Sequence, residues 1–311
     1  MTQELILQDN KTVVTGGLNS WLDRFFMFID VRDKSADTYQ KATKQFMKYL
    51  AENGISEPTR ETVINWREYL KETEHKATTI QLYLTAVKLF FTWLEQEGLY
   101  KNIANKVKGV KIQKGHKKDS LTSNQSKEVL SDIDTSTTKG KRDFAIVALL
   151  LTTGLRTIEI VRADVADLRT VGGNTVLFIQ GKGRDEKSEY VKVAPQVEKA
   201  LREYLRTRDS LNDNEPLFTS TSNENKGGRL TTRTISKIAK TSLVNAGLNS
   251  DRLTAHSFRH TAGTLALMNG AELTQVQQLL RHSNINTTMI YIDSIDRAKN
   301  NSEAIVADAI F

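Results

Sequence analysis

A run of lysines one third of the way along the chain constrains its fold more than any other feature. Residues 101–118 contain seven lysines and no acidic residue, so this segment carries a charge of +7, equal to the net charge of the whole chain of 311 residues. The residues before it sum to −2 and those after it to +2. A chain of this length is long for a single hydrophobic core. We therefore expect two domains, residues 17–100 and 119–294, joined by a lysine-rich linker at 101–118, with tails at 1–16 and 295–311.

The linker has two interpretations. Lysines that lie on phosphates gain affinity by releasing counterions, which indicates a polyanion such as nucleic acid as the partner. The candidate contacts are Lys106, Lys108 and Lys111. The same composition is also typical of a solvated tether between domains. On charge alone the two interpretations are equally supported.

The remaining composition excludes several classes of protein. The apolar fraction of 39% is sufficient for packed cores, which excludes a wholly disordered chain. The absence of cysteine excludes a disulfide scaffold, a thiolate metal site and a cysteine nucleophile. The first residues lack the basic flank and apolar segment of a signal peptide. The longest apolar run, Phe144 to Leu151, has eight residues and is too short to span a bilayer. We expect a cytoplasmic protein with no membrane partner.

The first domain is predicted to consist of four helices, because apolar side chains recur there at intervals of three and four residues. The first covers 18–29, the second begins after Ser35 and runs to Leu50, the third opens at Glu57-Pro58, and the fourth opens at Thr78 or Thr79. Ser35 can cap the second helix, and Gly98 stops the fourth. The second helix also carries a basic stripe roughly opposite its apolar side, formed by Lys41, Lys44 and Lys48.

The second domain is predicted to be mostly helical with one small antiparallel sheet. Thr122-Ser-Asn-Gln125 is typical of a capping box at a helix start. The helix expected at 142–152 is apolar on nearly all sides and should be buried. Two strands, 176–180 and 189–193, flank a polar tip that contains Lys182. Further helices are expected at 195–208, 232–246, 257–269 and 273–281, followed by one that carries Tyr291. The fold class is therefore mainly α with a small antiparallel β-sheet, in two domains.

Histidines concentrate near the end of the second domain. Three of the five, His256, His260 and His282, fall within 27 residues. The segment Ala255-His-Ser-Phe-Arg-His260 places His256, Arg259 and His260 on one helix face. This spacing can bind zinc, but metalloproteases with it have glutamate after the first histidine, where this chain has Ser257, and no further ligand is evident nearby. An arginine between the histidines favours an anion, and the planar guanidinium fork suits a phosphate.

Two further motifs are weak when taken singly. Thr152-Thr-Gly-Leu-Arg156-Thr-Ile-Glu159 follows the apolar helix, and its glycine permits a sharp turn from which Arg156 emerges beside the core. By itself this could be a surface ion pair between Arg156 and Glu159. Tyr291 lies nine residues after His282 in a threonine-rich segment, and a lone tyrosine is more often a core or interface residue.

Taken in order, these motifs resemble the tyrosine recombinase (phage-type integrase) family. The order is Thr-Gly-Leu-Arg-x-x-Glu, Gly-Lys-Gly in a strand hairpin, His-x-x-Arg-His, and Leu-x-His-Ser-x-x-x-Thr-Thr-x-x-Tyr. The resemblance covers nearly the whole chain, because that family has a helical core-binding domain before its catalytic domain. There is one departure: Arg281 stands where relatives commonly have glycine before the histidine.

The resemblance implies a role for each residue that matches a family motif. The scissile phosphate would be surrounded by Arg156, His256, Arg259 and His282. Tyr291 would be the nucleophile and Lys182 the general acid, with Lys187 on the same hairpin tip as the competing candidate. Glu159 and His260 would brace the site. The chemistry would need no metal, no ATP and no other cofactor.

The resemblance also implies a site-specific DNA recombinase that works through a 3′-phosphotyrosine intermediate, in the integration or excision of a mobile element. Two alternatives are a type IB topoisomerase and a catalytically silent DNA-binding regulator. The partners would be duplex DNA, three further copies of the chain that exchange C-terminal tails on the DNA, and accessory DNA-bending proteins. A major-groove helix would present Arg233, Lys237 and Lys240, although these side chains could equally form an ordinary solvated face.

Overall fold

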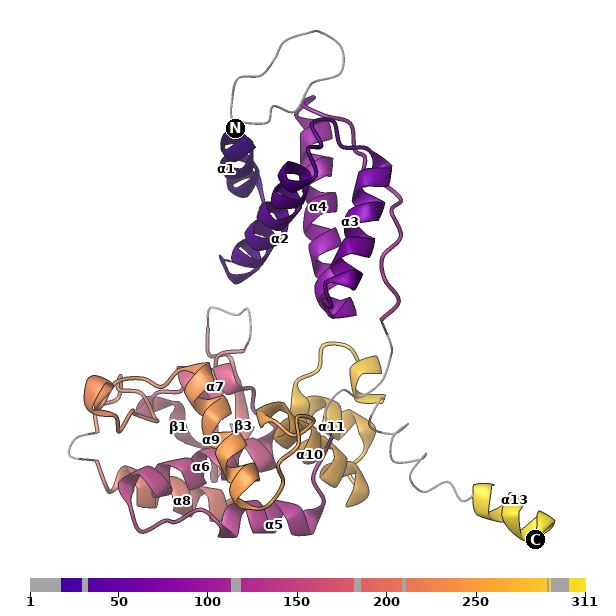
Figure 1. Cartoon of the computed structure of the whole chain (residues 1–311). Helices are drawn as coiled ribbons and strands as arrows, with labels where there is room; N and C mark the ends of the chain where they lie inside the picture. The colour runs from indigo at the N-terminus through magenta and orange to yellow at the C-terminus, as the bar shows by residue number, and fades with distance from the viewer. Residues whose placement is uncertain are drawn as a thin grey trace. The chain divides into compact units, whose positions relative to one another are not determined.

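The computed structural model describes residues 18–29, 33–112, 119–181, 186–208, 211–289, 291 and 302–311. The chain divides into two compact units, residues 1–114 and 115–311 (Figure 1). No helix in the described part is long and apolar enough to cross a membrane.

Four helices form the first unit, as the apolar spacing predicts: α1 (Leu18–Phe28), α2 (Asp33–Glu52), α3 (Arg60–Glu72) and α4 (Ala77–Gln96). α3 begins at a capping box in which the Thr59 hydroxyl accepts a hydrogen bond from the backbone N–H of Thr62. The core of the unit is aromatic, and the rings of Phe46 and Trp66 meet edge to face with centroids 4.9 Å apart. The three exposed lysines of α2 lie on the side away from this core.

The first part of the predicted linker packs against the helical unit. Ile103, Ala104 and Val107 are buried in its core. Lys88 Nζ donates to the carbonyl oxygen of Val107 at 2.6 Å, and a second bond joins Arg67 to the carbonyl oxygen of Lys108. Residues 101–112 therefore follow the surface of the helices, and residues 113–118 lie outside the described part of the chain.

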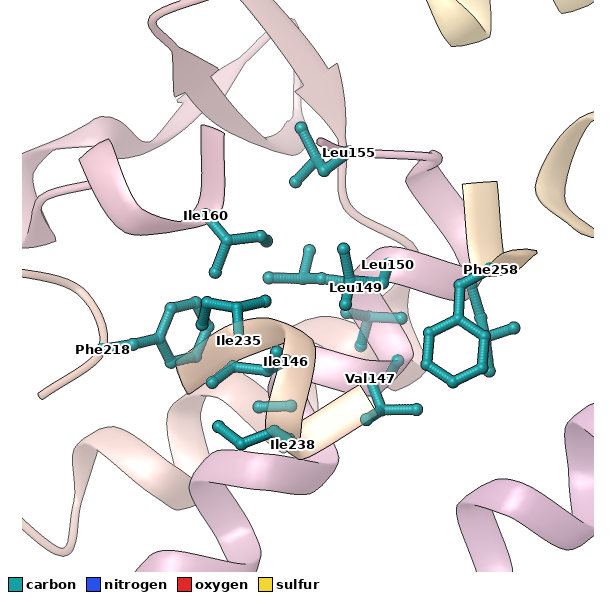
Figure 2. Close-up of a cluster of buried hydrophobic side chains, with 14 of the residues drawn as sticks. Ile146, Val147, Leu149, Leu150, Leu155, Ile160, Phe218, Ile235, Ile238 and Phe258 are labelled. Atoms are coloured by element: carbon teal, nitrogen blue, oxygen red, sulfur yellow. The ribbon is translucent and has the colours of Figure 1, made fainter. Parts of the chain in front are cut away.

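The second unit is built around a buried helix, α6 (Thr138–Thr153). Four helices contact α6 directly: α5 (Ser123–Ser131), α8 (Pro195–Leu205), α9 (Thr232–Asn245) and α10 (Ala255–Met268). Figure 2 shows apolar side chains of α6 lying among those of α9, α10 and the segment that follows α6. A helix that buries nearly every side chain must lie in the centre of its domain, as its uniformly apolar sequence predicts.

Three smaller elements complete the region around the end of α6. They are α7 (Thr157–Arg162), the 3-10 helix η1 (Val165–Asp167) and α11 (Leu273–Leu280). A second 3-10 helix, η2 (Asn223–Asn225), lies in the loop before α9. Residues 286–289 and 291 are helical, so Tyr291 lies on a helix as predicted. The last element is α13 (Ser302–Ile310).

The antiparallel sheet has three strands, one more than the sequence pattern predicts. Its order is β1 (Leu168–Val171), β2 (Asn174–Ile179), β3 (Glu189–Lys192). β1 was missed because it is short and mostly exposed, so it lacks an alternating apolar pattern. A local signal for it exists: Gly172 and Gly173 both have positive φ and form the two-residue turn between Val171 and Asn174, and such a turn is typical of a hairpin.

Candidate active site

Side chains from four segments converge next to the C-terminal end of α6. These segments are the start of α7, the first two turns of α10, the end of α11, and the short helix that carries Tyr291. The ring of His260 lies 5.3 Å from that of Tyr291 between centroids, and His256 lies 4.6 Å from His260. The ring of His282 stacks on that of Tyr291 at 6.4 Å. The structure therefore brings Tyr291 together with all three histidines predicted for the site.

A glycine turn places Arg156. Gly154 ends α6 in the left-handed conformation with φ 58°, and a Cβ atom there would come within 2.6 Å of the Leu280 side chain. Two residues later, Arg156 is the N-cap of α7. The buried carboxylate of Glu159 accepts hydrogen bonds from the Arg156 backbone N–H at 2.7 Å and from Nη1 at 2.9 Å. One third of the Arg156 side chain remains exposed.

Arg259 ties two of these segments together. Its side chain lies on α10 and is 2% exposed. Nη1 donates to the carbonyl oxygen of Gly154 at 2.5 Å, and Nη2 donates to that of Leu280 at the end of α11. Burial, together with the charges of Arg156 and Arg281, lowers the pKa of Arg259 to about 9, so the guanidinium is still charged at neutral pH.

His282 is held by contacts with α11 and with the following helix. Its Nδ1 lies 2.9 Å from the hydroxyl of Thr288, and its carbonyl oxygen accepts a hydrogen bond from the Gln277 side chain. Burial and the neighbouring charges of Arg259, Arg156 and Arg281 lower the pKa of His282 to about 4. The imidazole is therefore neutral at pH 7 in the DNA-free chain.

Thr288 is a residue that the sequence analysis missed. It is fully buried, whereas its neighbour Thr287 is exposed. Because the Thr288 hydroxyl bonds Nδ1, it orients the His282 ring and leaves Nε2 available to a substrate. The sequence contains two adjacent threonines at this position, and only the packing shows which of them contacts His282.

Thr288→Val should slow DNA cleavage on the order of tenfold to a hundredfold, the range seen when a partner that orients a functional histidine is removed. Valine keeps the shape of the side chain and loses the hydrogen bond. Thr288→Ser should restore the rate, and Thr287→Val should leave it unchanged. The measurement is the single-turnover rate of covalent adduct formation beside duplex affinity. Equal rates for the two valine variants would show that the hydroxyl does not orient His282.

Tyr291 is packed into the site rather than exposed. Its side chain is 3% exposed, and its ring lies against Gly263 of α10, where an added Cβ atom would be 3.4 Å from Cε1 and Cζ. Burial raises the pKa of Tyr291, while the charge of Arg259 acts in the opposite direction. Gly263 thus provides the space for the ring, a role that no sequence motif indicated.

Of the two candidate lysines of the hairpin, only Lys187 is among the described residues. Lys182 lies outside the described residues. Lys187 is held between two carboxylates: its Nζ donates to Asp164 at 2.6 Å and also to Asp167. Asp164 in turn pairs with Arg229 at 2.5 Å, so Lys187 belongs to a network of ion pairs that joins the hairpin to η1.

The candidate DNA-binding residues are mostly exposed in their own units. On the helical unit these are Lys41, Lys44, Lys48, Lys106, Lys108 and Lys111. On α9, Arg233 and Lys237 are exposed. Lys240 is half-buried instead, and its Nζ donates to the carbonyl oxygens of Ser250 at 2.8 Å and Leu253 at 3.5 Å. We therefore keep only Arg233 and Lys237 as proposed groove contacts on this helix.

Replacing three of the exposed lysines after α4 by glutamine tests whether they contact DNA; these are Lys106, Lys108 and Lys111. Affinity should fall for all sequences alike, and the slope of log K against log salt should become shallower by about 0.9 for each lost phosphate contact. Titrations of specific and unrelated duplexes at several salt concentrations measure this. Lys199→Gln, an exposed lysine of α8, is the matched control. An unchanged slope would identify the segment as a tether.

The site as a whole is suited to a phosphodiester. An attacked phosphate develops negative charge on its non-bridging oxygens, and arginine and imidazole N–H groups stabilise that charge. The ring of Tyr291 lies among these groups, and its hydroxyl is a possible nucleophile. No group of three histidine, aspartate or glutamate side chains in the described part of the chain could hold a metal ion.

Known proteins resemble the chain over both units. The phage integrase family matches residues 119–297, and the phage integrase N-terminal SAM-like domain matches residues 18–98. Tyrosine recombinase XerC of Herpetosiphon aurantiacus is 30% identical over 297 residues, which covers 91% of this chain and 94% of that protein. Tyrosine recombinase XerD of Listeria monocytogenes is 28% identical over 288 residues, with 88% and 94% covered.

Solved structures show the same fold. A post-cleavage complex of the XerH site-specific recombinase with a palindromic difH substrate aligns with a TM-score of 0.74 at 21% identity, covering 98% of this chain and 99% of that chain. A lambda integrase dimer bound to a COC′ core site aligns with a TM-score of 0.68 at 17% identity, covering 87% and 96%. This chain belongs to the phage integrase family, whose tyrosine recombinases are enzymes that cleave and rejoin DNA.

Proposed function

We propose that this chain integrates and excises a mobile DNA element in the cytoplasm, by recombination at specific sites. The observation that carries the cleavage chemistry is the contact of Tyr291 with His260 and His282 beside the buried Arg259. The mobile element is suggested by two proteins of the same fold, lambda integrase and the integrase of the Tn1549 transposon in complex with circular intermediate DNA.

In the proposed reaction, Tyr291 loses its phenol proton to water, which the surrounding cations favour, and the phenolate oxygen attacks the phosphorus of one strand. A 3′-phosphotyrosine bond forms and the bond from phosphorus to the 5′ oxygen breaks. Lys182 donates the proton that the departing 5′ oxygen takes up. The developing charge on the phosphate is stabilised by Arg156, Arg259, His256 and His282, while Glu159 and His260 hold their neighbours in place. The energy of the phosphodiester stays in the tyrosyl linkage, so the 5′-hydroxyl of another strand can rejoin without ATP.

Trapping the covalent complex tests this function. The full chain is incubated with fragmented genomic DNA of its source, the adducts are captured in SDS, and the attached strands are sequenced. We expect one duplex sequence, linked through its 3′ end, at both junctions of a mobile element. Ends that all map to one fixed chromosomal site would instead support resolution of replicated DNA.

Plasmids that carry the trapped sequence separate the remaining alternatives. A recombinase should produce recombinants only from plasmids with two copies of the sequence. Relaxation of supercoiled plasmids whether or not they carry the sequence would indicate a topoisomerase. Binding without any adduct would indicate a silent regulator and would overturn the proposal.

We further propose that four protomers assemble on the DNA and exchange C-terminal tails, with accessory DNA-bending proteins as possible partners of the assembly. No described residue of α13 is buried; Ile305 and Ile310 are exposed on it, and Phe311 is exposed directly after it. A cluster of exposed apolar side chains is unfavourable in water and is typical of a docking segment. A lambda integrase tetramer bound to a Holliday junction has the same fold.

Deletion of residues 303–311 should leave binding to a single site intact and impair synapsis and recombination. The reason is that the deletion removes the apolar face of α13 and none of the residues proposed to contact phosphate. Gel-shift titration on one site and recombination between two sites measure the two effects. A matched variant changes only the polar Glu303 to Gln. Equal recombination by the truncated and full-length chains at matched concentration would contradict tail exchange.

A further inference from the structure

Arg281 adopts an unusual conformation at the centre of the candidate site. It is the C-cap of α11 with φ 52° and ψ 48°, the left-handed region that side chains other than glycine rarely adopt. Two other described residues besides glycines have positive φ, Glu74 and Lys106, and both lie exposed. The side chain of Arg281, in contrast, is 9% exposed. A residue kept both in a strained backbone conformation and in a buried position is held there by what its side chain contacts.

The guanidinium of Arg281 reaches the anchors of both candidate arginines. Nη2 donates to Glu159 Oε2 at 3.0 Å, the same oxygen that accepts the backbone N–H of Arg156. It also lies 3.4 Å from the carbonyl oxygen of Gly154, which accepts Nη1 of Arg259. Nη1 donates to the carbonyl oxygen of Leu279, so the side chain also closes its own helix end.

The charges around Arg281 do not balance. Three guanidinium groups, those of Arg156, Arg259 and Arg281, lie near the buried carboxylate of Glu159, which pairs with the first and the last of them. A second carboxylate, that of Glu189, also acts on Arg281, so the cations still outnumber the anions. Burial and the charge of Arg156 lower the pKa of Arg281, while the Glu159 carboxylate raises it. Such an excess of buried positive charge is costly without an anion, and a phosphate would supply one.

We propose that Arg281 is a positioning residue of the recombination site: it fixes Glu159, and through it Arg156, to the turn that carries His282, and it adds a third cation next to the bound phosphate. This inference rests on the proposed function. Arg281 connects α7 with the end of α11. It therefore sets the distance between Arg156 and His282, which are proposed to bind the same phosphate. Nη1 and Nη2 of Arg281 donate to protein atoms, whereas its buried Nε has no hydrogen-bond partner in the described part of the chain.

A structural cap alone would act differently from a positioning cation. Glycine adopts the left-handed conformation without strain, so Arg281→Gly would preserve a turn whose side chain did nothing else. The pKa of His282 responds to the charge of Arg281 and can therefore be used to detect it. The charged and titratable groups that face His282 are Arg259 and His256 from α10, Arg156 from the start of α7, Tyr291 from the next helix, and Arg281 itself.

The test compares Arg281→Gly, Arg281→Gln and Arg281→Lys with Arg202→Gln, in which an arginine paired with a glutamate on the exposed face of α8 is neutralised. The first measurement is the pKa of His282 in the full DNA-free chain, by NMR titration assigned with His282→Gln. We expect the pKa to rise from about 4 in the Gly and Gln variants, to rise less in the Lys variant, and to stay in place in Arg202→Gln.

The second measurement is the single-turnover rate of adduct formation on the duplex recovered by covalent trapping, at saturating protein. Loss of the positioning contacts should slow cleavage on the order of 10²-fold in Arg281→Gly, with partial recovery in Arg281→Lys and little change in duplex affinity. Parental cleavage and an unchanged His282 pKa in Arg281→Gly would overturn the proposal. If the parent chain itself cleaves no DNA, the proposed function fails, and the titration still decides whether Arg281 acts on His282. Thermal unfolding of each variant identifies any that does not fold. If Arg281→Gly or Arg281→Gln does not fold, Arg281→Lys is compared with the parent chain instead.

Discussion

Tyr291→Phe should abolish the covalent protein–DNA adduct and leave duplex affinity nearly unchanged. The hydroxyl is the only group removed, and it is the atom that would bond to phosphorus. The ring itself is retained, so its packing on Gly263 and its stacking on His282 persist. Burial raises the pKa of Tyr291, so the hydroxyl is protonated in the DNA-free chain and needs cationic surroundings to react. The measurement is SDS-resistant adduct on labelled duplex, beside a gel-shift titration.

A matched control separates the loss of a nucleophile from the loss of a buried hydroxyl. Tyr204 is also buried in the second unit, and its hydroxyl is 3.1 Å from that of Thr219. The Tyr204 hydroxyl also accepts a hydrogen bond from the backbone N–H of Thr219 at 3.1 Å. Tyr204→Phe should therefore lower stability by about 2 kcal/mol, at about 1 kcal/mol for each bond, and should still form the adduct. An adduct that survives in Tyr291→Phe would remove Tyr291 from the proposed mechanism.

Lys182→Ala should slow cleavage of ordinary DNA by roughly 10²- to 10⁴-fold, the range in which a general acid contributes. The same variant should recover on a duplex with sulfur in place of the bridging 5′ oxygen at the scissile phosphate. A thiolate leaves without needing a proton, so this substrate removes the need for the acid. The measurement is the single-turnover cleavage rate on each duplex. A large ratio of the sulfur rate to the oxygen rate identifies Lys182 as the general acid.

Lys187→Ala is the control for Lys182→Ala, because Lys187 is the competing candidate for the general acid. The Lys187 ammonium pairs with Asp164 and Asp167, so its loss should disturb the support of the hairpin. A variant that acts through support should be slowed equally on the oxygen and sulfur substrates. Selective rescue of Lys187→Ala by sulfur, without rescue of Lys182→Ala, would move the acid to Lys187.

Local sequence patterns were sufficient for most of the secondary structure. The capping box at Thr122 starts α5 where predicted, and the uniformly apolar segment after Arg142 is buried in α6. Such signals are local, because a helix cap or an apolar face depends on residues within a few positions of one another. β1 was missed because its short, exposed sequence carries no such periodicity.

The linker shows where composition misleads. Its lysines dominate the net charge, yet Ile103, Ala104 and Val107 between them are buried against the helical unit. Charge describes the side of a segment that faces water, whereas packing is decided by the few apolar side chains on its other side. Which residues of the segment are buried can be seen only from the packed core of the helical unit.

The sequence by itself determined the order of the helices, the motifs and, through them, the family. Only the tertiary structure decided how the motif residues hold one another. Thr288 rather than Thr287 meets His282, Lys187 pairs with two carboxylates, and Arg281 bonds Glu159 across 122 positions of the chain. The physical reason is that these contacts join side chains from different segments of the fold. Their distances depend on how those segments pack against one another, and no pattern within one segment encodes that packing.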